Sequence, residues 1–149
     1  MRQYSPLIAA LIAVATGAAA GADSAAVDRA VEPPPHQVVA IYFHRTIRCP
    51  TCKRISSYVE EAVKTAFARE LKTRSVELHM VDFEDGKNQQ LAQAYKITGP
   101  TLVLADVYDG QTKRWTPMPK VWSLVGQKEK FLAYVQDGIT TYLHGEPPS

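Results

Sequence analysis

Two cysteines, Cys49 and Cys52, constrain this chain most, because of the segments on either side of them. Residues 38–43 (Val-Val-Ala-Ile-Tyr-Phe) form a β-branched and aromatic run that is typical of a fully buried strand. Residues 50–71 then carry apolar side chains at helical spacing, and Pro50 suits the first turn of a helix. The C-x-x-C motif is therefore predicted between the end of a buried strand and the start of a helix.

This position favours a reactive thiolate. Unpaired N–H groups at a helix N-terminus stabilise negative charge, so we expect Cys49 to ionise readily. A thiolate is the nucleophile of disulfide exchange, and Cys52 is near enough in the chain to attack a mixed disulfide formed at Cys49. Arg48 next to the motif and His44 near the end of the strand are candidates for tuning the pKa of the Cys49 thiol.

Other uses of the cysteine pair fit the sequence less well. A structural disulfide would close a very short loop and stabilise the fold by about 2 kcal/mol, against about 4.7 kcal/mol for a 100-residue loop. A zinc site would need further ligands, and the four histidines show no paired spacing. We therefore expect a redox pair with no metal and no cofactor. A redox-silent binding or assembly module and a metallochaperone stay as alternatives.

The rest of the chain alternates between strand and helix patterns. Strands are expected over 76–83, 101–108 and 111–116, and helices over 89–96 and 128–143. Asp109-Gly110 predicts a tight hairpin, because both positions tolerate positive φ. Leu91, Ala94 and Tyr95 are expected to face the core from the short helix. Parallel strand pairing is expected across the helical connections, followed by the antiparallel hairpin.

Residues 1–22 are predicted to be a signal peptide. Arg2 precedes an almost wholly apolar stretch, residues 7–20, and small residues in an A-x-A pattern follow. The alternative is an uncleaved anchor helix, although the stretch is short for a membrane span, which needs about 20 residues. Cleavage would leave no stable membrane insertion and a secreted, periplasmic or otherwise extracytoplasmic protein.

Three further segments are expected after the signal peptide. Residues 23–37 end in Pro33-Pro34-Pro35 and read as an extended linker, residues 38–144 as one domain, and residues 145–149 as a flexible tail. The chain of 149 residues has 17 basic and 15 acidic side chains, a formal charge of +2. So small a surplus argues against a nucleic-acid-binding surface.

Residues 38–144 resemble the thioredoxin superfamily. The resemblance is carried by Cys49-Pro50-Thr51-Cys52 after the first strand, and by Gly99-Pro100-Thr101 at the start of a later one. It implies an α/β thioredoxin-like fold, in which helices flank a central mixed sheet of about four strands. It also implies that Pro100 is a cis-proline facing the C-x-x-C motif, and that the backbone of Gly99 pairs with an extended substrate segment.

Two positions depart from thioredoxins proper. Phe43 stands where they carry a buried Asp that helps to move a proton to and from the second thiol, and Arg48 stands where they carry a Trp. The proton of Cys52 then needs another route, through solvent or through a carboxylate such as Asp82 or Glu84.

A smaller bacterial family resembles the chain more closely. Residues 42–52, 114–115, 120–122 and 128–136 look like the thioredoxin-like proteins labelled nitrophenyl compound nitroreductase subunit. The label implies an electron-relay partner of a separate catalytic subunit, since nitro-group reduction needs a flavin or nicotinamide that nothing here binds.

The function that these patterns favour is an exported thiol–disulfide oxidoreductase or electron-relay protein. Its partners would be thiols or disulfides of proteins or small molecules, together with a redox partner that the sequence does not identify. Trp115 and Trp122 flank Pro117-Met118-Pro119, and they either form a partner-docking patch or pack against the sheet.

Overall fold

A computed structural model of the chain describes residues 32–145, and these form a four-stranded mixed sheet with helices on both faces. The strand order is β2-β1-β3-β4. The elements in chain order are β1 (His36–His44), α1 (Pro50–Ala66), α2 (Ala68–Thr73), β2 (Val76–Asp82), the 3₁₀ turn η1 (Gly86–Asn88), α3 (Gln89–Ala94), β3 (Thr101–Tyr108), β4 (Gln111–Pro117), α4 (Lys120–Leu124) and α5 (Lys128–Leu143).

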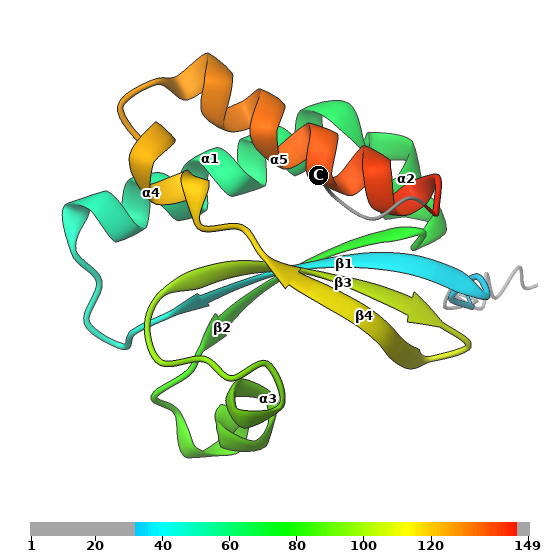
Figure 1. Ribbon diagram of the computed structural model, residues 1–149, viewed down its shortest axis with the longest axis horizontal. Coiled ribbons are helices and arrows are strands. Elements are labelled where there is room, and N and C mark those ends of the chain that lie inside the picture. The colour runs from blue at the N-terminus through cyan, green and yellow to red at the C-terminus, as the bar shows by residue number, and fades with distance from the viewer. Residues whose placement is uncertain (1–31, 146–149) are drawn as a thin grey trace, which may run out of the picture.

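The helices form two unequal layers. The long helices α1 and α5 lie side by side over one face of the sheet, with α4 beside them, whereas α3 lies against the opposite face (Figure 1). Strand β1 pairs in parallel with β2 and antiparallel with β3, which in turn pairs antiparallel with β4. This strand order and helix placement make the fold α/β and thioredoxin-like, as the sequence predicted.

The expected parallel pairing across both helical connections is wrong for β3, which runs antiparallel to β1. Strand β2 ends with Asp82 opposite His44, and β3 begins with Thr101 opposite Phe43. Both ends of the link through α3 therefore lie at the same edge of the sheet. A connection that begins and ends on one side of the sheet makes the next strand run in the opposite direction. A parallel strand would need a connection that crosses to the other side, where the first strand began.

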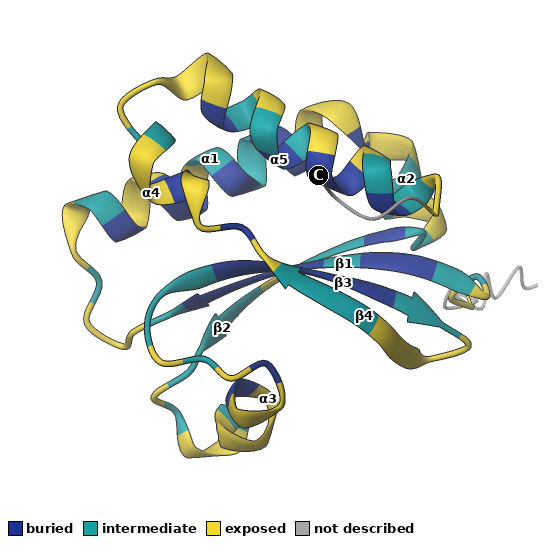
Figure 2. Ribbon diagram, in the orientation of Figure 1, coloured by how far each residue is buried: buried dark blue, intermediate teal, exposed yellow. Residues whose placement is uncertain are grey.

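Two apolar clusters occupy the two faces of the sheet. The larger one lies under α1 and α5 and includes Tyr42, and the smaller one, which includes Phe43, lies on the face that α3 covers. Figure 2 colours the central strands β1 and β3 mainly as buried. Because successive side chains of a strand point to opposite faces, Tyr42 packs in the larger cluster and Phe43 in the smaller one.

The helical pattern at 50–71 is interrupted. At Phe67 the backbone has φ −123° and ψ 32°, outside the helical region, so α1 ends there and the short α2 follows. Phe67 is 6% exposed and belongs to the larger cluster, which places its ring in the core at this break. Burial of one aromatic ring thus competes with continuity of the helix.

The short helix faces the core differently from the prediction. Tyr95 is buried as expected, but Leu91 is 37% exposed and Ala94 is exposed, while Ala92 is buried. Ala92 and Tyr95 are three residues apart and share one side of the helix, so the buried side of this segment passes through them and not through Leu91 and Ala94.

Two local predictions are confirmed. Asp109 and Gly110 have φ values of 50° and 73°, as a tight hairpin between β3 and β4 requires. The last helix occupies the predicted residues, and within it Gly138 allows a close approach. A Cβ added there would lie 2.7 Å from Met118 Cε and 2.9 Å from Leu104 Cδ1.

The predicted signal peptide (1–22), most of the predicted linker and residues 146–149 of the tail lie outside the described residues. Among residues 32–145, no helix combines the length and apolar character that crossing a membrane requires.

Candidate active site

The cysteine pair lies at the start of α1, so the predicted position is confirmed. Cys49 is the N-cap residue, with extended backbone (φ −70°, ψ 160°), and its Sγ accepts a hydrogen bond from the Cys52 N–H at 3.1 Å. Pro50 occupies the first turn, where a missing N–H costs nothing. The sulfur of Cys49 thus takes the role that a Ser or Asp oxygen plays at most helix starts.

The two thiols are free and their Sγ atoms lie 2.6 Å apart. Hydrogen bonds from the Cys52 thiol and then from the Cys52 N–H hold the pKa of the exposed Cys49 below its usual range. Burial raises the pKa of Cys52, which is 8% exposed, and its hydrogen bond to Cys49 raises that pKa further. The surroundings therefore favour the thiolate form at the solvent-facing Cys49 and the protonated form at the buried Cys52.

Two polar groups that no sequence pattern indicated, Tyr42 and Ser56, lie beneath the first turn of α1. The Cys52 carbonyl accepts hydrogen bonds from Ser56 Oγ at 3.0 Å and from Tyr42 Oη at 3.5 Å. Ser56 in turn accepts a hydrogen bond from the Arg48 guanidinium. The available signal was the spacing, since Ser56 follows Cys52 by one helical turn on the buried side of α1.

Arg48 and His44, the two candidates for tuning the pKa of Cys49, make different contacts. Arg48 is turned inward on Ser56, and its Nε is buried with no hydrogen-bond partner among the described residues. His44 Nδ1 lies 3.0 Å from the Arg45 carbonyl oxygen, and its ring is 6.4 Å from that of Tyr42. An effect of Arg48 or His44 on the pKa of Cys49 stays a prediction.

The two carboxylates proposed for the Cys52 proton are held by the loop after β1. Thr46 Oγ1 donates to Asp82 Oδ2 at 2.7 Å, and the Thr46 N–H donates to Glu84 Oε2 at 3.0 Å. Glu84 also pairs with Arg45 at 3.3 Å, and the Thr46 hydroxyl lowers the pKa of Asp82. None of the hydrogen bonds described for either carboxylate reaches Cys52.

The expectation of a cis-proline at Pro100 is wrong, because residues 32–145 contain no cis peptide bond. The trans isomer is intrinsically favoured by about 0.5–1 kcal/mol. Side chains also hold this turn: Thr101 Oγ1 donates to the Gly99 carbonyl at 2.9 Å, and Trp122 Nε1 donates to the Pro100 carbonyl at 3.2 Å. Since Thr101 pairs with Phe43, the turn still lies at the edge of the sheet where β1 ends.

The two tryptophans have different environments. Trp115 is half-buried and packs edge-on against Tyr95, with ring centroids 5.5 Å apart. Trp122 is 39% exposed on α4 and contacts the Gly99-Pro100 turn through its indole N–H. Packing therefore accounts for Trp115, whereas Trp122 links the surface of α4 to that turn.

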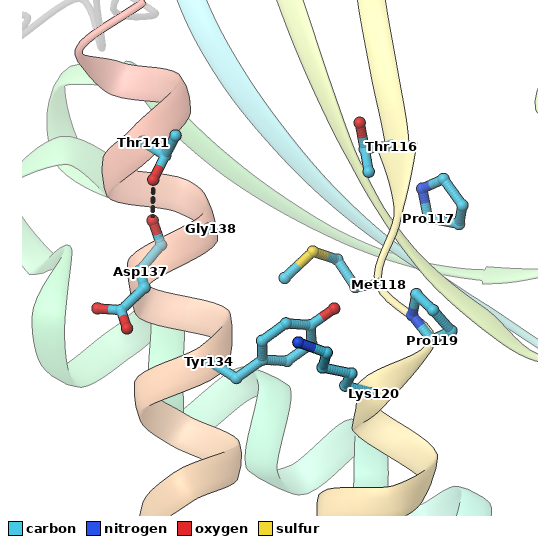
Figure 3. A pocket seen from close by; sticks show the side chains of 9 residues that line it. All are labelled: Thr116, Pro117, Met118, Pro119, Lys120, Tyr134, Asp137, Gly138 and Thr141. Carbon is cyan, nitrogen blue, oxygen red and sulfur yellow. Dashed lines mark hydrogen bonds between the residues drawn. The ribbon is translucent and has the colours of Figure 1, made fainter. Parts of the chain in front are cut away.

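A cavity of about 330 Å³ lies between α5 and the segment that joins β4 to α4 (Figure 3). Tyr134, Lys120 and Met118 are among the residues that line it, and the Lys120 ammonium lies 5.7 Å from the centre of the Tyr134 ring. No cysteine lines this cavity. Within residues 32–145, no group of three or more His, Cys, Asp or Glu side chains could hold a metal ion.

No protein-family model and no curated protein matches the chain. Among solved structures, thioredoxin O2 from Arabidopsis thaliana is 18% identical, with 64% of this chain and 76% of that chain covered and a TM-score of 0.40. Fasciola hepatica thioredoxin is 23% identical, with 66% and 81% covered and a TM-score of 0.38.

Such low values carry no argument about fold or activity, and they do not confirm the narrower resemblance to the nitroreductase-subunit family. The assignment depends instead on features of the chain itself: a strand order of β2-β1-β3-β4, helices on both faces, and a cysteine pair at the start of α1. By these features the chain has a thioredoxin-like fold.

Proposed function

We propose that this protein is a thiol–disulfide oxidoreductase or electron-relay protein that works through Cys49 and Cys52. The observation that carries the proposal is the asymmetry of the pair. Cys49 is exposed and its pKa is lowered, while Cys52 is buried, its pKa is raised, and the two sulfurs lie 2.6 Å apart. An accessible thiolate beside a retained thiol is what two-step disulfide exchange requires.

In the reducing direction, the Cys49 thiolate attacks one sulfur of a substrate disulfide. A mixed disulfide forms at Cys49, and the other substrate sulfur leaves as a thiolate. Cys52 then loses its proton to solvent and attacks the Cys49 sulfur, which closes the Cys49–Cys52 disulfide and releases the second substrate thiolate. Two electrons pass from the dithiol to the substrate. Oxidation of a substrate dithiol is the same sequence in reverse.

The Gly99-Pro100 turn is the proposed substrate-binding segment. It lies where β1 ends and β3 begins, the same edge of the sheet from which the chain leads to Cys49. The Trp122 indole holds the Pro100 carbonyl, so the turn has a defined backbone for an extended substrate to meet.

Replacing Trp122 by phenylalanine tests this role, because it keeps an aromatic ring but removes the N–H donor. We expect KM for a peptide disulfide to rise about threefold to tenfold, the loss of one ordinary hydrogen bond, with kcat changed less. The rate with a small disulfide such as hydroxyethyl disulfide should not change. An equal fall in both rates would contradict the assignment of the turn to peptide binding.

Export to a secreted or periplasmic location is part of the proposal and is supported by the signal-peptide pattern of residues 1–22. In an oxidising compartment, a reductant needs a separate electron donor. The narrower proposal is an electron relay to a partner enzyme, which the nitroreductase-subunit resemblance suggests. Measuring the reduction potential of the pair distinguishes the directions: about −270 mV indicates a reductant and about −120 mV an oxidant.

The proposal as a whole is tested by the reduction of insulin with dithiothreitol. The native chain should accelerate this reaction, and the Cys49→Ser/Cys52→Ser double variant should not. If the two proteins give the same rate, the redox proposal is wrong and a binding or assembly module on this scaffold is favoured.

A further inference from the structure

We infer that the Tyr42 hydroxyl is the buried hydrogen-bond donor that stabilises the Cys52 sulfur while it becomes a thiolate and attacks the mixed disulfide. This inference rests on the proposed function and names the group that serves its second step. Phe43, the next residue along the same strand, carries no polar group that could serve this step.

Side chains along β1 point alternately to the two faces of the sheet, so Tyr42, and not Phe43, lies on the face that α1 covers. Tyr42 belongs to the cluster beneath α1 and α5, whereas Phe43 packs on the opposite face with Tyr95, its ring 5.8 Å away. Cys52 is in the first turn of α1 and faces the sheet from the Tyr42 side. The phenol is thus a polar group of β1 that contacts Cys52, through the Cys52 carbonyl.

The hydrogen bond that the phenol makes to Cys52 is a weak one. Tyr42 is 0% exposed, and the hydrogen bond described for its hydroxyl, to the Cys52 carbonyl, is long at 3.5 Å. The same carbonyl has a shorter bond from Ser56 at 3.0 Å. When the Tyr42 hydroxyl donates to the Cys52 sulfur instead, the Cys52 carbonyl keeps the Ser56 donor, which it shares with the Lys53 carbonyl at 3.2 Å.

The groups around this phenol also decide its role. Cys49 and Cys52 face it from the start of α1, Arg48 from the preceding loop, and His44 from its own strand. Burial raises the pKa of Tyr42 far above its usual range, the cysteine charges raise it further, and Arg48 opposes them. A raised pKa favours the protonated phenol, which is the form that donates a hydrogen bond.

The second step then balances without a buried carboxylate. The Cys52 proton passes to solvent, the Cys52 thiolate attacks the Cys49 sulfur, and the bond between Cys49 and the substrate sulfur breaks. The leaving thiolate takes the electron pair. The Tyr42 hydroxyl lowers the energy of the buried anion, and its own proton stays in place.

The Tyr42→Phe variant tests this inference with dithiobis(nitrobenzoate) as the disulfide. The release of thionitrobenzoate then has two phases. The first follows attack by Cys49 and depends on reagent concentration, and the second follows attack by Cys52 and does not. We expect the variant to slow the second phase about tenfold and to move its pH dependence about one unit upward, with the first phase unchanged.

Tyr142→Phe is the matched control. Tyr142 is also 0% exposed, and its hydroxyl donates to Thr116 Oγ1 at 2.8 Å, away from the cysteines. Both phases should stay as in the native chain. In the native chain, the near-ultraviolet absorbance should show no tyrosinate forming as the second phase accelerates with pH. This second measurement needs no variant.

The outcomes separate the two proposals. A native chain that shows no second phase overturns the proposed function, and this inference with it. A native chain with both phases and a Tyr42→Phe variant with the same second phase overturns the inference alone. Equal slowing of both phases in Tyr42→Phe, or tyrosinate formation in step with the second phase, also contradicts it.

Discussion

Replacing Cys52 by serine is expected to stop turnover and to leave Cys49 joined to its substrate in a stable mixed disulfide. Serine is nearly the same size as cysteine, so it keeps the first turn of α1, but its hydroxyl does not displace a sulfur. No other thiol in this chain can take the place of Cys52, because Cys49 and Cys52 are the only two cysteines of the sequence. The covalent complex can be counted by intact mass after incubation with an oxidised peptide.

Cys49→Ser is the opposite case, because it removes the exposed thiolate. We expect no mixed disulfide and a rate of disulfide exchange equal to the uncatalysed rate. Cys52 remains, but it is 8% exposed and its pKa is raised, so it presents little thiolate to a substrate. A stable adduct on Cys49→Ser, or none on Cys52→Ser, would reverse the proposed roles.

Formation of the mixed disulfide on Cys52→Ser should become faster as the pH rises, because Cys49 reacts as the thiolate. A lowered pKa means that, at a given pH, a larger fraction of Cys49 than of free cysteine is thiolate. The rate of adduct formation on Cys52→Ser should therefore reach half its maximum below the usual cysteine pKa of about 8.5. The Cys52 N–H still donates to Cys49 in this variant, so part of the lowering should remain. A midpoint at or above the value of free cysteine would contradict the N-cap argument.

The largest loss of stability is expected from Asp106→Ala. Asp106 lies on β3 and is 2% exposed, with Oδ1 2.7 Å from His36 Nε2 and Oδ2 2.6 Å from Arg114 Nε. These contacts join the start of β1, β3 and β4. Removing this carboxylate is expected to cost about 3 kcal/mol, because it takes away two charge-assisted hydrogen bonds of about 1.5–3 kcal/mol each, and the partly exposed His36 and Arg114 side chains recover part of that loss from solvent. Urea denaturation measures this loss directly.

Two variants calibrate this prediction. Asp137→Ala removes an exposed carboxylate on α5 and should change the free energy of unfolding by less than about 0.5 kcal/mol. Asp106→Asn keeps the shape and one acceptor oxygen, so its loss should be smaller than that of Asp106→Ala. Disulfide exchange by the folded fraction should be unaffected. A loss below about 1 kcal/mol for Asp106→Ala would mean that these contacts do little to join the strands.

Patterns within short segments of the sequence determined much of this protein. The run at 38–43 predicted a buried strand, Pro50 and the spacing after it predicted a helix, and Asp109-Gly110 predicted a hairpin. Together they place Cys49 at the start of a helix. These features depend on backbone preferences and on side-chain periods of a few residues, which any window of the sequence contains.

Only the tertiary structure decided which groups meet at the site and how the strands pair. The direction of β3 depends on both ends of a link lying at one edge of the sheet, and the trans bond at Pro100 occurs in a turn that Trp122 helps to hold. Tyr42 faces Cys52 because a helix later in the chain covers one face of β1. Contacts between residues far apart in sequence have no local signature, since they depend on how whole elements pack.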